Sequence, residues 1–366
     1  MFPREVISTG QLVLRPPSSD DAESVAVACD DPVTARFLPL LASPYTLRDA
    51  HAYLASAAER WELGGAEFSI VRDGVYAGSV GLTPPDRWGV VDLGYTVAPQ
   101  ARGQGVGAAA ARAVTDWALD HGARRVQLEA EVENLASLRV AYKAGFMQEG
   151  VRREAKALRD GRRSDLVMFS RLPGETLSPP PKPYLPFFPT GQLSDGVVRL
   201  TPMGERWAAD FQKMMDQPSV RRYSLGPPLP PEEQLRRCRY TGFYWMSGQR
   251  VELAVRDAVS GEFAGHLQLM QIAPVLAQGM IGYSLMEGFQ GRGFMTRAVN
   301  LLVDWAFGHT ALRRIVAGTE VDNTASHRVL ERAGFTRESV NKGLLPRPDG
   351  TWADDVTWVR MRPPSA

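Results

Sequence analysis

The spacing of apolar residues along the chain predicts an alternating series of strands and helices. In residues 47–61, Ala50, Tyr53, Leu54, Ala57 and Trp61 recur at the period of a helix and would share one face. Short apolar runs that end at glycine or proline predict strands. The strands are expected at residues 11–15, 67–71, 76–82, 90–97, 125–132 and 165–170, and the helices at 18–29, 47–61, 108–120 and 136–144.

The same order returns in the second half of the chain. Residues 131–146 align without a gap with residues 320–335, and both segments end in Ala-Gly-Phe. Self-similarity over this length indicates that a whole domain was duplicated. The second set of strands is expected at residues 197–201, 251–255, 263–270, 280–285, 314–321 and 352–360, with helices at 208–215, 232–239, after Gly293, and at 326–333.

A proline-rich segment separates the two halves. Residues 179–189 contain six prolines, which disfavour both helix and strand pairing. We therefore expect domains at residues 1–173 and 193–366, joined by a semi-rigid linker over residues 174–192. A proline-rich ligand for a recognition module is the alternative for this segment. A length of 366 residues is also that of about two domains.

Composition narrows the class of protein. The hydrophobic content of 44% and charged content of 23% are typical of a globular protein, and the net charge of +1 gives no reason to expect nucleic acid or an anionic membrane as partner. No apolar run reaches the roughly 20 residues that span a bilayer. The two cysteines and five scattered histidines predict neither a disulfide framework nor a metal site. We expect a cytoplasmic protein that is a monomer or homodimer.

Two glycine-containing turns carry the candidate chemistry. Arg102-Gly-Gln-Gly-Val-Gly107 lies between a predicted strand and a predicted helix, where unpaired backbone amides can bind an anion. Gln290-Gly-Arg-Gly-Phe-Met-Thr296 repeats the arrangement. A dinucleotide-binding turn is the alternative. That turn normally belongs to a first strand–helix–strand unit, whereas this one comes after several strands. The two copies share only one pattern, in which Arg or Gln is followed by any two residues and then by Gly.

The shared pattern resembles the acyl-CoA pyrophosphate loop of the GNAT N-acetyltransferase superfamily. The Asn-x-x-Ser and Ala-Gly-Phe segments that follow each turn resemble the next helix and strand of that family. The second half is similar to the branch that includes the ribosomal-protein alanine acetyltransferases. The resemblance implies an α/β protein with two tandem acyl-CoA N-acyltransferase folds. Each would have a mixed sheet that splays where acyl-CoA enters.

The resemblance also implies acetyl-CoA or another acyl-CoA as co-substrate, without a metal. Pantetheine would bond to the backbone near Val97 and Leu285. Met295 is expected to narrow the second loop, which makes the first domain the stronger CoA site. Ordinary strand–helix turns, and helix capping by the two asparagines, are the alternatives. The residues implied are Val97, Arg102, Gly103, Gln104, Gly105, Val106, Gly107 and Asn134 in the first domain, and Leu285, Gln290, Gly291, Arg292, Gly293, Phe294, Met295, Thr296 and Asn323 in the second.

Four residues are candidates for catalysis. By the resemblance, Tyr142 would protonate the departing CoA thiolate, and Ser137 or Ser326 are the other candidates for that role. Asp92, on the strand before the loop, would take a proton from the amine. The alternatives are a packed tyrosine, helix capping by the serines and a solvated carboxylate. Asp92 and Tyr142 have no counterpart in the second domain, which has Met280 and Glu331 there.

These features predict an acyl-CoA-dependent N-acyltransferase. The acetyl group would pass to a primary amine by direct attack, and the acceptor would be a small-molecule amine or a protein N-terminus. A CoA-binding or regulatory module without turnover is one alternative. One active domain beside a degenerate one, using another donor such as succinyl-CoA, is a second.

Overall fold

The computed structural model describes residues 2–175, 185–347 and 350–364. The chain divides into two compact units, Met1–Lys182 and Pro183–Ala366. Residues 176–184 of the expected linker lie outside the described residues. Leu185 and Phe188, which we also assigned to the linker, are buried in the second unit. The Phe188 ring contacts those of Trp245 and Trp305, at 4.8 and 5.1 Å between centroids, so these apolar residues form part of a core.

Within the described part of the first unit, eight strands form one mixed sheet in the order β1-β2-β3-β4-β5-β6-β8-β7. The only parallel neighbours are β5 and β6. The strands are β1 (Ile7–Thr9), β2 (Leu12–Arg15), β3 (Ala66–Arg72), β4 (Val75–Leu82), β5 (Val90–Val97), β6 (Arg125–Glu131), β7 (Met147–Ala157) and β8 (Arg163–Arg171), and the helices are α1 (Ala22–Cys29), α2 (Pro32–Phe37), α3 (Leu47–Glu62), α4 (Val106–Asp120) and α5 (Leu135–Lys143).

The described part of the second unit repeats this sheet, in the order β15-β16-β14-β13-β12-β11-β10-β9. Its parallel neighbours are β13 and β14. The strands are β9 (Leu193–Ser194), β10 (Val198–Pro202), β11 (Val251–Asp257), β12 (Phe263–Ala273), β13 (Gln278–Leu285), β14 (Arg314–Glu320), β15 (Thr336–Pro346) and β16 (Trp352–Met361), and the helices are α6 (Ala208–Met215), α7 (Pro218–Arg221), α8 (Pro231–Met246), α9 (Phe294–His309) and α10 (Thr324–Arg332).

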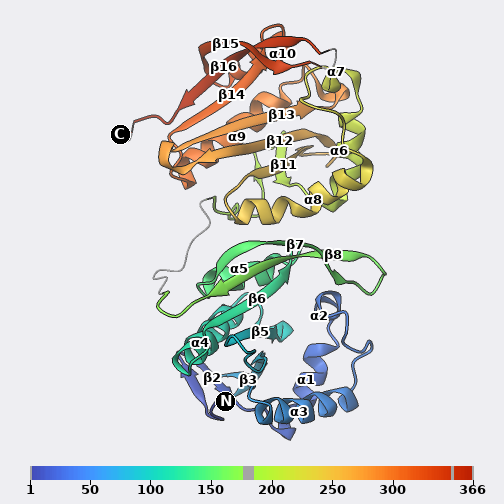
Figure 1. Cartoon of the computed structure of the whole chain (residues 1–366). Helices are drawn as coiled ribbons and strands as arrows, with labels where there is room; N and C mark the ends of the chain where they lie inside the picture. The colour runs from blue at the N-terminus through green and yellow to red at the C-terminus, as the bar shows by residue number, and fades with distance from the viewer. Residues whose placement is uncertain (1, 176–184, 348–349, 365–366) are drawn as a thin grey trace. The chain divides into compact units, whose positions relative to one another are not determined.

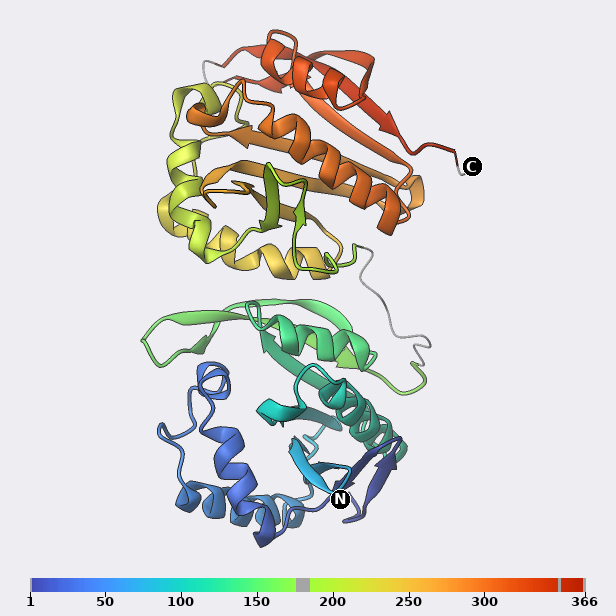
Figure 2. The ribbon, with the colours of Figure 1, turned by 180° about the vertical axis from the view of Figure 1, so that it is seen from behind.

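Helices cover both faces of each sheet. In the first unit, α1 and α3 pack together on one face, and α4 and α5 on the other. In the second unit, α6 and α8 take the first position and α9 and α10 the second, as the two opposite views in Figures 1 and 2 show. Successive residues of a strand point to opposite faces. Tyr95 and Val97 therefore face α4, while Asp92 and Thr96 face α3.

Each sheet opens into a fork at its parallel pair. β5 pairs with β6 only from Val90 to Asp92. Beyond Asp92, β5 continues along β4 and β6 continues along β8. The second unit has the same fork beyond Met280, the last residue of β13 that pairs with β14. One edge of each of these strands therefore has no strand partner among the described residues.

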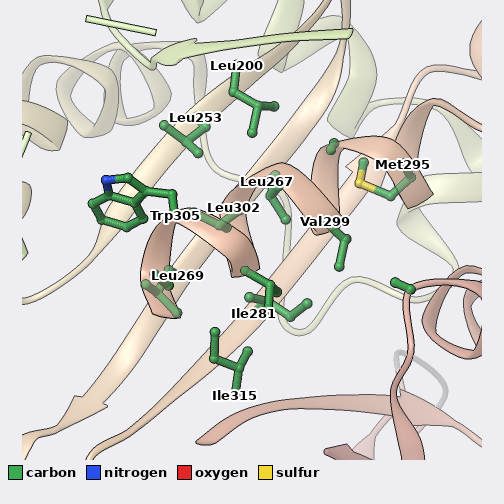
Figure 3. Packing of buried hydrophobic residues seen from close by; sticks show 14 of the residues in the cluster. Leu200, Leu253, Leu267, Leu269, Ile281, Met295, Val299, Leu302, Trp305 and Ile315 are labelled. Atoms are coloured by element: carbon green, nitrogen blue, oxygen red, sulfur yellow. The ribbon is translucent and has the colours of Figure 1, made fainter. Parts of the chain in front are cut away.

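Helix α9 seals the second core against the sheet. Figure 3 shows Val299, Leu302 and Trp305 of this helix beside residues of the central strands. The sequence patterns missed the short elements β1, β9, α2 and α7 and the strand β15, and they ended α8 at Arg239 although the helix continues to Met246. Several apolar and aromatic residues of this last part of α8 are buried.

Candidate functional site

Two glycines in each turn adopt the left-handed backbone conformation. Gly103 and Gly105 have φ of 75° and 82°, and Gly291 and Gly293 have φ of 72° and 79°. Side-chain-bearing residues rarely adopt these angles. Gly105 and Gly293 are the residues that precede α4 and α9. A Cβ atom on any of the four would meet no atom within 4 Å, so the space over both turns is open.

Both turns present unpaired amides to this open space. No acceptor among the described residues bonds to the backbone N–H of Gly103, Gln104 or Gly105, nor to that of Gly291, Arg292 or Gly293. The first amides of α4 and α9 also lack an intrahelical partner, and the helix dipole adds partial positive charge. Each turn is therefore suited to bind an anion such as a pyrophosphate.

The side chain at the first position of each turn, Arg102 or Gln290, bonds to the end of the preceding strand. Arg102 donates from Nε to the carbonyl oxygen of Val97 at 3.2 Å and from a terminal nitrogen to Asp31 at 2.6 Å. Gln290 donates to the carbonyl oxygen of Leu285 at 3.4 Å. These side chains shape the turn. They also occupy the carbonyl groups of Val97 and Leu285, which were predicted to bond to pantetheine.

The remaining polar side chains of the turns differ. Gln104 donates to the Gln100 carbonyl oxygen at 2.7 Å. The second turn has Arg292 at this position, whose side chain is 52% exposed and whose guanidinium lies 5.0 Å from the ring centres of both Phe289 and Phe294. Each turn therefore carries one arginine, but Arg102 of the first turn is paired with Asp31, whereas Arg292 of the second is exposed at the third residue of the turn.

The expectation that Met295 narrows the second loop is wrong. Met295 is 3% exposed and belongs to the hydrophobic core, where Figure 3 shows it on the same helix as Val299. In the first unit, a Cβ on Gly107 would lie 3.0 Å from Val97 and 3.2 Å from Val140. The position faces inward in both units, and the two loops keep the same backbone conformation.

A tyrosine–serine pair lies between the fork strand and the following helix in each unit. The Tyr95 hydroxyl is 2.8 Å from Ser137 Oγ, and the Tyr283 hydroxyl is 2.7 Å from Ser326 Oγ. Burial raises the pKa of both tyrosines, so both remain protonated at neutral pH. Both serines were predicted as candidates, whereas the tyrosines were missed. The repeated Gly-Tyr on the two strands was the available signal.

Asn134 and Asn323 cap the helices that carry these serines. The side-chain oxygen of Asn134 accepts from the Ser137 amide at 3.1 Å, and Asn323 makes the same bond with Ser326. Such a cap typically stabilises a helix by about 1 kcal/mol. The interpretation of Asn134 and Asn323 as helix caps therefore describes these contacts. The caps also fix the positions of Ser137 and Ser326.

Tyr142 occupies a different side of α5 from Ser137. Its hydroxyl donates to Gln148 on β7 at 2.5 Å, and its ring contacts Phe169 edge-on at 5.3 Å between centroids. Burial raises its pKa to about 12. Five helical residues separate it from Ser137, a rotation of about 140°. The structure therefore does not bring Tyr142 together with the Tyr95–Ser137 pair.

Asp92 stands at the opening of the first fork. Its side chain is exposed on the α3 face and accepts from Gln127 at 2.8 Å. Glu131 at the end of β6 is 2% exposed and lies 2.8 Å from Lys156. Its ion pair explains how a carboxylate can lie at that depth. Asp92 is thus the more accessible carboxylate.

Equivalent strands of the two units each bury a glutamate on the α3 or α8 face. Burial raises the pKa of Glu67, although Arg60 and a 2.6 Å hydrogen bond from Tyr53 act to lower it. Burial also acts to raise the pKa of Glu252, but His266, Arg237 and Arg250 together lower it to about 2. Burial lowers the pKa of His266. Glu252 is therefore the more firmly ionised of the two carboxylates.

The described residues contain neither a candidate metal site nor a candidate membrane-spanning helix. No group of three histidine, cysteine, aspartate or glutamate side chains there could hold a metal ion. Among the helices of the described ranges, none combines the length and apolar character that crossing a membrane requires. Cys29 and Cys238 are free thiols.

Comparison with known proteins gave one family for both units. The family model described as acetyltransferase (GNAT) domain matches residues 11–147 and 198–336. The "Probable N-acetyltransferase YjcK" of Bacillus subtilis is 32% identical over 147 residues, which are 36% of this chain and 81% of that protein. The ribosomal-protein-serine acetyltransferase of Escherichia coli is 35% identical over 81 residues, covering 22% of this chain and 45% of that protein.

Solved structures were also matched. The ribosomal-protein-S5-alanine acetyltransferase of Vibrio fischeri has a TM-score of 0.44 and 22% identity, covering 47% of this chain and 97% of that one.

Proposed function

The chain belongs to the GNAT family of N-acetyltransferases, and we propose that each of its two units binds acetyl-CoA for transfer of the acetyl group to a primary amine. The observation that carries this proposal is the pair of open glycine turns, each with unpaired amides beside a strand fork. The preference for the first unit rested on its loop, which lacks Met295, and on Tyr142. Because the Met295 side chain lies in the core, we extend the proposal of acetyl-CoA binding to both units.

The backbone amides of each turn would hold the pyrophosphate of the co-substrate. Gly103 to Gly107 supply them in the first unit, and Gly291 to Met295 in the second. The unpartnered edge of each fork strand would receive the pantetheine arm as an added strand. Arg292 would add one charge-assisted contact in the second unit. These assignments account for the positive φ angles and for the open space above the glycines.

We assign proton donation to the tyrosine–serine pairs. The amine nitrogen attacks the thioester carbon, a carbon–nitrogen bond forms and the carbon–sulfur bond breaks. Ser137 would protonate the departing thiolate while the Tyr95 hydroxyl holds its Oγ in place, and the serine would regain a proton from water; Ser326 and Tyr283 would act likewise. The proton that the amine releases would pass to Asp92 in the first unit, directly or through water, and to water in the second unit. An acid role for Tyr142 stays a prediction.

The acceptor is an amine, and the two units suit different kinds. The second unit has Met280 in place of Asp92. An N-terminal α-amino group has a pKa of about 7.7–8.0, so an appreciable fraction is already neutral at physiological pH, whereas a lysine amine has a pKa of about 10.4. We therefore propose an α-amino group as the acceptor of the second unit.

The test counts bound acetyl-CoA in the full chain by native mass spectrometry. Gly103→Asp places a negative charge where the pyrophosphate would bind, and Gly103→Asn is its neutral, equally sized control. Both residues tolerate positive φ better than other side chains do. Gly291→Asp and Gly291→Asn form the second pair. We expect two bound molecules in the unmodified chain and in both Asn variants, and one in each Asp variant. One molecule in the unmodified chain would contradict binding by both units.

A CoA-binding module without turnover remains the second candidate function, because the described contacts show binding groups more directly than reacting ones. Release of free thiol from acetyl-CoA in the presence of amines separates the two. A donor panel that includes succinyl-CoA is needed, since another acyl group would escape an acetyl-only assay. Stoichiometric binding without thiol release for every donor would support the module.

A further inference from the structure

A cleft of about 390 Å³ lies on the α8 side of the second unit. Its floor includes Gln268 and Met270 of β12, and these residues pair in register with Gly282 and Met280 of β13. Paired residues of neighbouring strands point to the same face and lie about 5 Å apart. The cleft therefore lies beside the strand that borders the fork, on the face opposite α9.

Cationic and aromatic side chains line the cleft. Arg250 lies over the Tyr244 ring at 4.2 Å and contacts the buried Glu252 through Nε at 2.9 Å. Arg237 contacts the same carboxylate at 3.0 Å. Two guanidinium groups thus share one carboxylate, which leaves several of their N–H donors available. The lining contains Glu233, Arg236, Arg237, Tyr240, Tyr244 and Arg250.

Arg236 adds a third positive charge to the cleft. Its side chain lines the cleft from the exposed surface of α8, and no ion-pair or hydrogen-bond partner for it lies among the described residues. Against the three guanidinium groups stand Glu233 and the buried Glu252. His266, which also contacts Glu252, stays neutral because burial lowers its pKa. The cleft therefore carries an excess of positive charge.

The first unit lacks this arrangement. Glu67, the counterpart of Glu252, is covered by Tyr53 and Arg60. Gly65 and Gly81 stand where the second unit has Arg250 and Gln268, and a Cβ on either would approach Arg60 or Glu67 within 3 Å. The space that forms the cleft in the second unit is thus filled in the first.

We infer that this cleft holds a carboxylate or phosphate group of the amine acceptor of the second unit. Guanidinium groups bind both anions through paired, charge-assisted hydrogen bonds. The volume lies in the range of small-ligand sites, and Tyr240 and Tyr244 would contact the apolar part of the acceptor. The inference rests on the proposed function for the position of the reacting amine. The anion site itself depends only on the residues of the cleft.

The test uses the full chain and two matched pairs of tripeptide amides with free N-termini. Ala-Glu-Ala is compared with Ala-Gln-Ala, and Ala-phosphoserine-Ala with Ala-Ser-Ala. Binding is measured by calorimetry and acetyl transfer by thiol release. We expect at least one anionic peptide to bind about tenfold more tightly than its neutral twin. The pair with the larger difference identifies carboxylate or phosphate as the recognised group.

Arg236→Gln is the principal variant because this exposed side chain has no structural partner to lose. Arg313→Gln is its control, an equal charge change on an exposed residue outside the cleft. We expect Arg236→Gln to remove most of the preference for the anionic peptide without changing the affinity for the neutral one. Equal binding of the twins by the unmodified chain, or equal effects of Arg236→Gln and Arg313→Gln, would overturn the inference.

The same measurements separate this inference from the proposed function. If thiol release is absent but the anionic peptide binds in an Arg236-dependent way, the anion site stands and acetyl transfer fails. If all four peptides are acetylated with equal affinity, acetyl transfer stands and the anion site fails. Gly291→Asp, which should remove CoA from the second unit, is expected to leave peptide binding unchanged.

Discussion

The two units agree on one face of the sheet and differ on the other. Both keep the fork, the positive-φ glycines and the tyrosine–serine pair on the side of α4 or α9. On the opposite side, Glu67 lies under Tyr53 and Arg60, whereas Glu252 lies among Arg237, Arg250 and His266 beside a cleft. The duplicated fold thus retained the proposed co-substrate side and changed the side from which an acceptor would approach.

The largest effect is expected where the two buried carboxylates differ. Glu252→Gln leaves two guanidinium groups near a neutral amide, and breaking a buried ion pair typically costs about 3–5 kcal/mol. Glu67→Gln should cost about 1 kcal/mol, because the one amide oxygen of Gln can still accept from Arg60 while its NH2 group donates to the Tyr53 hydroxyl. Hydrogen exchange with mass spectrometry on the full chain reports each unit separately. Similar losses of protection for the two variants would remove the contrast.

Catalysis provides the next comparison. Ser137→Ala and Ser326→Ala together are expected to slow thiol release about 100-fold while acetyl-CoA stays bound, since a positioned acid typically contributes that much or more. Each single variant shows the share of its own unit. Tyr142→Phe tests the other predicted acid, and under our assignment to the serines its rate should stay within about twofold of the unmodified chain. A large loss in Tyr142→Phe with none in Ser137→Ala would reverse the assignment.

A smaller loss of stability is expected from substitutions at Gly107 and Met295, the equivalent inward-facing positions at the start of α4 and α9. Gly107→Ala adds a methyl group 3.0 Å from Val97 and 3.2 Å from Val140, and overpacking of this kind costs about 1–3 kcal/mol. Local hydrogen exchange in α4 would report the loss. Met295→Leu, which keeps the volume of a residue already buried, should cost less than about 1.5 kcal/mol and serves as the control. Equal costs would show that the two positions are packed alike.

Mild acidification should change the folding stability of the two units in opposite directions. The lowered pKa of His266 means that the unfolded second unit binds more protons than the folded one as pH drops from 7 toward 5, so its stability falls over this range. The lowered pKa of Glu252 adds a further loss below about pH 5. The raised pKa of Glu67 contributes stability at low pH that is lost as pH rises. Hydrogen exchange at pH 7 and pH 5, corrected for the intrinsic rates, measures both. Loss of stability by the first unit alone would contradict this.

Local sequence patterns predicted most elements and the location of both turns. Periodicity identifies α9, because its apolar positions face one core, and positive φ follows from the glycines of the turns. The link between Tyr95 and Ser137 joins residues on different elements, so no local pattern reveals it. The same holds for the bond between Arg102 and Asp31, which are 71 residues apart.

The direction of a side chain could not be predicted from its position in the sequence. Met295 was assigned to the loop because it follows the glycines, but the first turn of a helix points some of its side chains into the core. Ser137 and Tyr142 were candidates for the same role, and the structure places them on different sides of one short helix.

The fork also has a consequence for how each unit opens. In the first unit, β1–β5 and β6–β8 are joined through the sheet by one parallel stretch of three residue pairs, and α4 contacts strands on both sides. Such a short seam makes the two strand groups natural candidates for separate cooperative opening. A molecule that fills the fork would add backbone bonds along the seam. Binding of a molecule in the fork would then make the two strand groups open together instead of separately.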